Sequence, residues 1–422
     1  MFEAAVAMSR KWDAGEAGSE VGKGIKEKLK KPPKFVLLFS TIHYEKYGGF
    51  QKFLDAVNKE LPEGTPVVGG TVAGFMNNYG CYTIGASAMA VYDDEMDVAV
   101  SVGYNAKRSP RKAVDTVISG IPNRQFKNRL VVSVISGGMV PQFMGISPKK
   151  TIQSNLIGNL LSKTFDLSLF FLQKGVAREE EILSYVITKM PNDKLISVST
   201  EDNNEMIINY QFLSKKVVNN AIIFLVVDSN HELNLRTDHG LKPTGLTVDV
   251  TELASDKRWM RKINGKPAKQ ELLRLLNWPE QYVDEKIYTR SFYYPFASEK
   301  NGFLTPFISG LIWGESVYAT YQLTNKKLRL LSGSGSDVIS SYSKVLSDVK
   351  NPLMVFAAEC GIRIGNLGSK VYLEHKQMKE TVGDTPFLSV YVAGEATFSP
   401  EFGLCYGNHT VNAAVLYDQV SK

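Results

Sequence analysis

Short apolar runs alternate with amphipathic stretches along this chain, and the alternation has a recognisable order near the N-terminus. An apolar run at 35–39 is followed by an amphipathic stretch and then by a second run, which ends in a Val-Ala-Gly tripeptide at Gly74. A glycine-rich loop and a third apolar run at 88–92 complete the unit. Runs of this length, bounded by turn residues, predict buried strands, and the amphipathic stretch between them predicts a helix.

The same order returns near the C-terminus. An apolar run at 353–357 leads through an amphipathic stretch to a second Val-Ala-Gly, which ends at Gly394, and a last run covers 411–417. From the first residue of the unit to the tripeptide glycine there are 39 residues (74−35) in one copy and 41 (394−353) in the other. Internal similarity of this kind indicates duplicated β-α-β-β units.

A looser third copy is expected between these two. A strand at 130–135 is followed by helical stretches at 151–161 and 178–190 and by a return strand at 195–199. The Val-Ala-Gly tripeptide is missing here, so this copy is predicted from the order of its elements alone.

At 422 residues the chain is too long for one ordinary core. We expect an N-terminal helical segment over 1–34, which Pro32 and Pro33 end, followed by one lobe over 35–238 and a second over 239–422. The predicted fold class is α/β, with mixed sheets and two packed lobes built from duplicated β-α-β-β units.

Composition narrows the class of protein. Hydrophobic residues make up 44% and charged residues 22%, which is ordinary for a soluble protein. No apolar run approaches the roughly 20 residues that cross a bilayer, and the N-terminus lacks the pattern of a signal peptide. Three cysteines make no disulfide framework. We therefore expect a cytoplasmic protein without a membrane partner.

The net charge of +6 raises the question of nucleic acid. Much of the local basicity lies in six lysines between Lys23 and Lys34. A solvated helix face is the better interpretation, because no aromatic RNA-stacking motif accompanies the run.

Several short motifs occur in a fixed order along the chain. They are Gly69-x-Thr71-x-x-Gly74, His239-Gly-Leu-Lys-Pro-Thr-Gly245, Cys360-x-x-Arg363, Gly394-Glu395 and Asn408-x-Thr410. In this order and spacing they resemble the FIST sensory domain from about Phe35 to the end. One position departs from the pattern: many relatives continue the first turn with glutamate, whereas Phe75 follows Gly74 here.

The resemblance implies an intracellular sensor of small metabolites such as amino acids. No output domain or F-box pattern is visible, so the expected output is a signalling protein partner or a change in homo-oligomeric state. Some relatives bind haem and sense nitric oxide, which leaves a haem-binding gas sensor as an alternative.

Arg363 is the first candidate for the ligand pocket. It directly follows a buried-strand pattern, so it stands at the carboxyl end of a strand, where α/β proteins form ligand crevices. Its guanidinium suits bidentate capture of a carboxylate. The competing interpretation is a structural ion pair with Glu359 or Glu374.

Glu395 would take the ligand amine, because the repeat gives it the turn equivalent to Gly74. Its competing interpretation is an exposed loop carboxylate. Together with the positions matched by the resemblance, the expected ligand-binding set is Thr71, Gly74, His239, Cys360, Arg363, Glu374, Glu395, Asn408 and Thr410.

For two members of this set, a purely structural role is the better interpretation than ligand binding. His239 suits a neutral imidazole that bonds the backbone of its own turn. Cys360 is better interpreted as a buried inert thiol than as a nucleophile, since no sequence motif orients His375 or His409 beside it. A cysteine-dependent enzyme is therefore the weakest alternative, with no catalytic residue assigned. No metal site is expected, because the histidines form no His-x-x-x-His pair.

Overall fold

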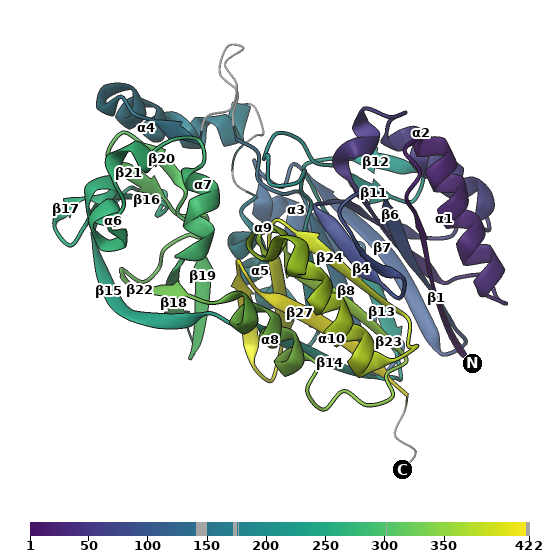
Figure 1. Ribbon diagram of the computed structural model, residues 1–422. Coiled ribbons are helices and arrows are strands. Elements are labelled where there is room, and N and C mark those ends of the chain that lie inside the picture. Colours follow the sequence, from purple (N-terminus) through teal and green to yellow (C-terminus); the bar gives the residue numbers. More distant parts are fainter. Residues whose placement is uncertain (141–149, 172–174, 176, 301, 419–422) are drawn as a thin grey trace.

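The molecule consists of two bodies that lie side by side (Figure 1). The computed structural model describes residues 1–140, 150–171, 175, 177–300 and 302–418. The three-sheet body comprises residues 1–135, 177–238 and 333–418. The second body comprises residues 150–171 and 239–332.

The first sheet of the three-sheet body has the strand order β1-β6-β2-β3-β11-β12. Its strands are β1 (Phe2–Ser9), β6 (Ala86–Asp93), β2 (Phe35–Thr41), β3 (Val67–Val72), β11 (Gln211–Leu213) and β12 (Lys216–Val218). Helices α1 (Ala14–Lys28) and α2 (Phe50–Glu60) cover its outer face. Asp13 caps α1 by accepting the N–H groups of Gly15 and Glu16 at 2.9 and 3.0 Å.

The second sheet has the order β26-β25-β10-β8-β13-β7. Its strands are β26 (Gly403–Gly407), β25 (Glu395–Ser399), β10 (Lys194–Ser199), β8 (Asn128–Ile135), β13 (Ala221–Ser229) and β7 (Met96–Tyr104). Helices α3 (Pro110–Ser119) and α5 (Glu179–Lys189) pack on its outer face, where the second body also contributes to the same apolar cluster.

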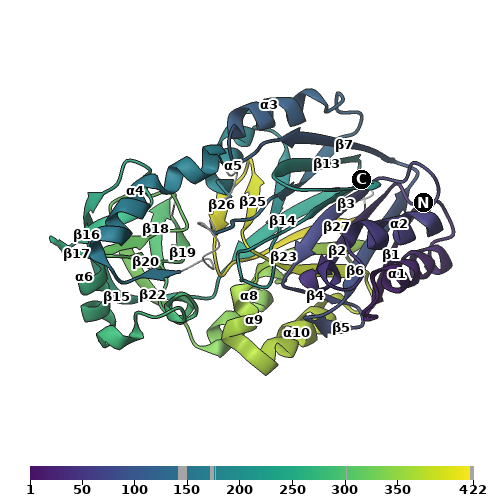
Figure 2. The same ribbon diagram turned by 90° about the horizontal axis from the view of Figure 1, so that it is seen from above.

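The third sheet has the order β14-β27-β23-β24-β4-β5. Its strands are β14 (Glu232–Asp238), β27 (Val411–Tyr417), β23 (Met354–Cys360), β24 (Phe387–Val392), β4 (Gly74–Asn77) and β5 (Gly80–Tyr82). Helices α8 (Gly335–Val345), α9 (Ile362–Leu367) and α10 (Tyr372–Val382) lie on its outside. Figure 2 shows the three sets of helices on three different sides of the strands.

The three sheets are built on one plan. In each, a central strand pairs in parallel with the strand after its helix and antiparallel with the strand that closes the unit: β2 with β3 and β6, β8 with β10 and β13, β23 with β24 and β27. The predicted duplication of 35–92 and 353–417 is therefore confirmed in strand order. The middle copy follows the same order, so the unit occurs three times.

Each unit also gives its hairpin to a neighbour. The hairpin β4–β5 follows β3 in the chain but pairs with β24, β25–β26 follows β24 but pairs with β10, and β11–β12 follows β10 but pairs with β3. This cyclic exchange gives the body an approximate threefold arrangement.

Backbone hydrogen bonds at the three exchange points repeat the same cycle. Ala73 N–H donates to the Tyr391 carbonyl at 2.9 Å, and Ala393 N–H donates to the Ser199 carbonyl at 3.1 Å. The third bond runs from Glu201 N–H to the Thr71 carbonyl at 2.9 Å. The three turns thus meet one another where the sheets converge.

The inner faces of the three sheets share one core. Alternate residues of the central strands, Phe39, Val132 and Phe356 among them, belong to a single buried apolar cluster. The rings of Phe39 and Phe356 stack across it at 6.0 Å between centroids. Because every sheet is buried on both faces, its strands appear in the sequence as continuous apolar runs.

The second body is a mostly antiparallel sheet with three α-helices among its described residues. Its strands are β9 (Thr151–Ile152), β15 (Lys242–Leu253), β16 (Trp259–Ile263), β17 (Lys266–Pro267), β18 (Phe296–Lys300), β19 (Phe303–Phe307), β20 (Leu311–Trp313), β21 (Ser316–Tyr318) and β22 (Lys327–Ser332). Its helices are α4 (Asn155–Phe171), α6 (Ala268–Leu276) and α7 (Ile287–Arg290). Among the described residues, no helix has the length and apolar character needed to cross a membrane.

Two sequence-based expectations differ from this architecture. Residues 1–34 are not helical throughout, because β1 pairs with β6 along its whole length, from Phe2 opposite Asp93 to Ser9 opposite Ala86. Pairing in a sheet overrides the helical preference of its alanines. There are two bodies, as there were two expected lobes, but residues 333–418 return to the three-sheet body instead of completing a lobe that begins at 239.

Candidate functional site

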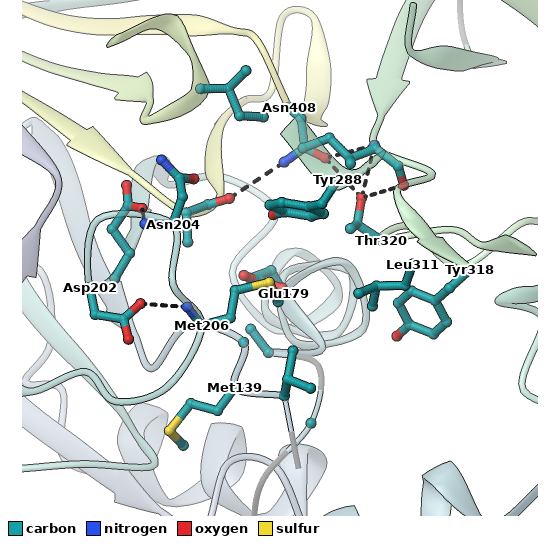
Figure 3. A pocket seen from close by; sticks show the side chains of 18 of the residues that line it. Met139, Glu179, Asp202, Asn204, Met206, Tyr288, Leu311, Tyr318, Thr320 and Asn408 are labelled. Atoms are coloured by element: carbon teal, nitrogen blue, oxygen red, sulfur yellow. Dashed lines mark hydrogen bonds between the residues drawn. The ribbon is translucent and has the colours of Figure 1, made fainter. Parts of the chain in front are cut away.

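A cavity of about 70 Å³ lies between the two bodies, at the carboxyl ends of the parallel strands β8 and β10 (Figure 3). The carboxyl ends of parallel strands are where open α/β sheets bind ligands. A single water needs roughly 10–15 Å³ on this measure, so the space admits a small organic group. The cavity is thus a candidate ligand site at the contact between two bodies.

Both bodies supply apolar walls. The three-sheet body and the segments next to it contribute Met139, Val140, Met206, Ile362 and Ala393, and the second body contributes Tyr288, Ile308, Leu311 and Tyr318. A ligand here would touch both bodies at once.

An amide side chain links the two bodies at the cavity. Asn408 Oδ1 accepts from the Thr320 hydroxyl at 2.9 Å and from Ile308 N–H at 3.3 Å. Its Nδ2 donates to the Ala393 carbonyl at 3.4 Å. These bonds, part of which Figure 3 shows as dashed lines, orient Asn408 at the wall.

Three carboxyl groups line the same cavity, namely those of Glu179, Glu201 and Asp202. Burial, aided by the neighbouring charge of Asp202, raises the pKa of Glu201 to about 8. Burial also raises the pKa of Glu179 and of Asp202. The cavity therefore holds one carboxyl group, that of Glu201, whose pKa lies near neutral pH.

The three carboxyls differ in their partners. Asp202 accepts the backbone N–H groups of Met206, Ile207 and Ile208 at 2.7, 2.6 and 2.8 Å, so it shapes the loop after β10. Glu179, at the start of α5, accepts a long bond of 3.5 Å from the Tyr406 hydroxyl.

Glu201 has one oxygen without a hydrogen-bond partner among the described residues. Its Oε2 accepts Asn204 N–H at 3.1 Å, while its Oε1 is buried without a hydrogen-bond partner. An unpartnered buried polar atom is costly, and a ligand is one reason to keep it.

Of the nine residues expected to bind ligand, one lines this cavity, Asn408. Glu395, Thr410 and Cys360 lie in the layer behind it. Glu395 Oε1 accepts the Thr410 N–H at 3.0 Å and its hydroxyl at 2.9 Å, so this carboxyl is buried and not an exposed loop group. Cys360 belongs to the small apolar cluster that contains Tyr288 and Ile308.

Arg363 and Glu374 lie elsewhere, in a buried ion-pair cluster between β23 and helices α8 and α10. Arg363 Nε donates to Glu374 at 2.9 Å and lies 3.4 Å from Glu359, with all three side chains fully buried. The other nitrogens of Arg363 donate to the carbonyls of Val338 and His409 at 2.9 and 3.1 Å. With its donors engaged inside the protein, Arg363 matches the ion-pair interpretation of the sequence.

The remaining three expected residues have structural surroundings. Thr71 accepts Tyr210 N–H at 3.1 Å where β3 meets the exchanged hairpin. A side chain at Gly74 would place its Cβ 2.8 Å from the Tyr82 carbonyl, so close backbone approach explains this glycine. His239 Nδ1 accepts Leu241 N–H at 2.9 Å within its turn, and burial lowers its pKa.

Glu179, Glu201 and Asp202 were missed by the sequence analysis, as was Tyr288. The sequence carried no clear signal for Glu201, because the backbone bonds of the structure match Glu201 with Ala73 and Ala393 and not with Glu395. No sequence pattern brings the second body to this point.

The cavity does not fit haem. Its described lining contains neither histidine nor cysteine, and an axial ligand of one of these types is the usual anchor. Cys360 is 1% exposed, and burial raises the pKa of its thiol well above the usual range. Both ring nitrogens of His409 are buried and have no hydrogen-bond partner among the described residues, so no hydrogen bond connects the imidazole ring to Cys360. His375 instead bonds the Asn77 carbonyl through Nε2 at 3.0 Å.

The fold and the site together define an α/β protein with repeated units and a cavity at the ends of its strands. Residues 34–266, more than half of the chain, match the FIST N domain, and the protein belongs to the FIST family. FIST domains are sensory domains associated with signal transduction.

Similarity to solved structures is remote. The cyanuric acid hydrolase of A. caulinodans is 8% identical, with 54% of this chain and 71% of that chain covered and a TM-score of 0.25. A cyanuric acid hydrolase described as an innovation by structural concatenation is 9% identical over 99% of this chain and 100% of that one, with a TM-score of 0.33. PurLQS from Thermotoga maritima is 11% identical over 99% and 73%, with a TM-score of 0.21. These scores support no transfer of activity, and no curated protein matches the chain.

Proposed function

We propose that the protein is a sensor of a small metabolite and that the ligand binds in the cavity between the two bodies. The observation that carries the proposal is the buried Glu201 Oε1, which has no hydrogen-bond partner among the described residues and belongs to a residue of the cavity wall. A ligand that satisfies it would replace a destabilising group with a bonded one.

The position of the cavity suggests how a signal would arise. A ligand in contact with both Met206 and Leu311 would favour one packing of the second body on the three-sheet body, because it binds that arrangement better. The output would then be read by a signalling protein partner or by a second copy of the chain.

If the ligand is an amino acid, its ammonium group would contact the carboxyl groups of Glu201 and Glu179. Its carboxylate would not be held by Arg363, whose guanidinium is engaged with Glu374 and Glu359. We further propose a cytoplasmic location, which is supported by three cysteines that are all free.

The test is a thermal-shift screen of metabolites against three forms of the protein. Leu311→Trp fills the cavity from the second body, and Leu246→Trp adds the same ring at an exposed site on β15. A true ligand raises the melting temperature of the wild type and of Leu246→Trp but not of Leu311→Trp. Equal shifts in all three proteins, or no shift with any metabolite, would argue against the proposal.

A further inference from the structure

We propose that the cavity selects a small organic cation that carries no carboxylate, and that Glu201 releases a proton to solvent when the cation binds. This inference rests on the proposed function, because it concerns the ligand of the same cavity. It follows from the charge of the wall, the geometry of Glu201 and the aromatic surface opposite.

The described wall is acidic, with the Lys150 ammonium group at its edge against Tyr288 and Asn204. Glu179, Glu201 and Asp202 line the cavity, and no lysine or arginine occurs among its described lining residues. A ligand carboxylate would meet three acidic groups in a poorly solvated space, which is unfavourable. An ammonium or amidinium would meet acceptors.

Glu201 is held so that one oxygen is free. Asn204 N–H bonds Oε2 at 3.1 Å, and the carboxyl rests on the backbone of Gly361, where a Cβ would lie 2.2 Å from Oε1. A side chain at 361 would therefore require the Glu201 carboxyl group to move. The site is therefore built around an acceptor that the protein itself leaves without a donor.

Burial is the main reason why Glu201 holds a proton in the absence of a ligand, and the adjacent Asp202 carboxyl adds to it. Three further ionisable groups interact with Glu201: Glu395 from β25, the Cys360 thiol from β23 and Tyr288 from the second body. Burial raises the pKa of each of these three groups, which favours their neutral forms, so none of the three supplies a positive charge that would hold Glu201 as a carboxylate.

The Lys150 ammonium group of the chain itself lies against part of this wall. Lys150 Nζ lies 4.7 Å from the centroid of the Tyr288 ring and donates to the Asn204 carbonyl at 3.2 Å. The electron-rich face of a tyrosine attracts cations. Tyr288 and Met206 would thus pack on the hydrocarbon part of a ligand whose nitrogen reaches Glu201.

Proton balance gives the proposal a quantitative signature. The ligand cation binds the carboxylate form, and the proton of the Glu201 carboxyl leaves to the buffer. Since the pKa of this group is about 8 in the free protein, affinity should rise about tenfold per pH unit between pH 6 and 7.5 and level off above 8.

The experiment compares amines with the amino acids that have the same side chains: tyramine with tyrosine, agmatine with arginine, and isoamylamine with leucine. Isothermal titration at pH 6, 7, 8 and 9, in two buffers of different ionisation enthalpy, counts the protons released. We expect at least one amine of the three pairs to bind the wild type at least tenfold more tightly than its amino acid, with close to one proton released at pH 7.

Glu201→Gln should weaken amine binding at least tenfold at pH 8 and abolish its pH dependence. Glu205→Gln changes an exposed carboxyl of the same loop and should leave both unchanged. Binding without proton release in the wild type, or unaltered by Glu201→Gln, would overturn the inference. The wild-type proton count decides the matter even if Glu201→Gln folds poorly.

The two proposals fail in different ways. If a neutral or anionic metabolite binds, and Leu311→Trp blocks it, the cavity is the sensor site but the cation inference is wrong. If no metabolite or probe responds to Leu311→Trp, the proposed function itself is lost.

Discussion

Replacing Arg363 by methionine should be among the most damaging single changes in the three-sheet body. Methionine keeps the length of the side chain but removes its charge and its donors. Glu374 and Glu359, both fully buried, would lose the cation that lies 2.9 and 3.4 Å from them. The carbonyls of Val338 and His409 would each lose an N–H donor.

The magnitude follows from burial. Removing one partner of a buried ion pair typically costs about 3–5 kcal/mol, because the other charge is left uncompensated. Burial already raises the pKa of Glu359. Removing the Arg363 charge would raise the pKa of Glu359 further, so the loss should be larger at pH 8 than at pH 5.

A matched exposed pair provides the control. Arg329 contacts Glu299 at 2.8 Å, but the two side chains are 47% and 46% exposed. Arg329→Met should therefore cost no more than about 1 kcal/mol. Urea unfolding followed by circular dichroism at pH 5 and pH 8 measures both variants.

A double variant separates charge from packing. Arg363→Met combined with Glu374→Gln should be less damaging than the sum of the single changes, because the amide needs no cation. The reasoning would be refuted if Arg363→Met lost no more stability than Arg329→Met. It would also be refuted if the loss did not depend on pH.

Three further predictions concern the cavity and the thiol. The folded state raises the pKa of Glu201 from 4.5 to about 8, so the stability linked to its proton is complete below pH 4.5 and is lost as the pH rises to 8. Urea unfolding at pH 5 and 7 should show that the free energy of unfolding falls by roughly 3 kcal/mol less in Glu201→Gln than in the wild type. Equal decreases in the two proteins would contradict this prediction. The buried thiol of Cys360 should resist iodoacetamide at pH 7 until urea unfolds the protein. Rapid alkylation of Cys360 in the native protein, detected by mass spectrometry, would contradict this prediction. Added haemin should give no shifted Soret band, and a band that disappears in His409→Ala would show that the fit argument is wrong.

The repeated unit could be predicted from the sequence because its parts are local. The run at 35–39 and the run at 353–357 are buried on both faces, and such strands have continuous apolar residues whatever their neighbours. The spacing to Gly74 and Gly394 then follows from one helix and one strand. Even the middle copy could be found from element order.

Residues of the site were harder to predict than the units. Asn408 lines the cavity, whereas Arg363 does not, because a position at a strand end is compatible with either a ligand or an ion pair. The sequence does not say whether Glu374 or a ligand carboxylate lies 2.9 Å away. That choice depends on where α10 packs.

By itself the sequence determined the class of fold, the repeated unit and the family, since each depends on patterns within some 60 residues. Only the tertiary structure decided which sheet each hairpin joins, that residues 2–9 form a strand beside β6, and that Tyr288 meets Glu201 across a cavity. The physical reason is that local patterns specify which face of an element is buried but not what it is buried against. Pairing partners far apart in the chain are selected by packing of the whole core, and the pKa of Glu201 follows from that packing alone.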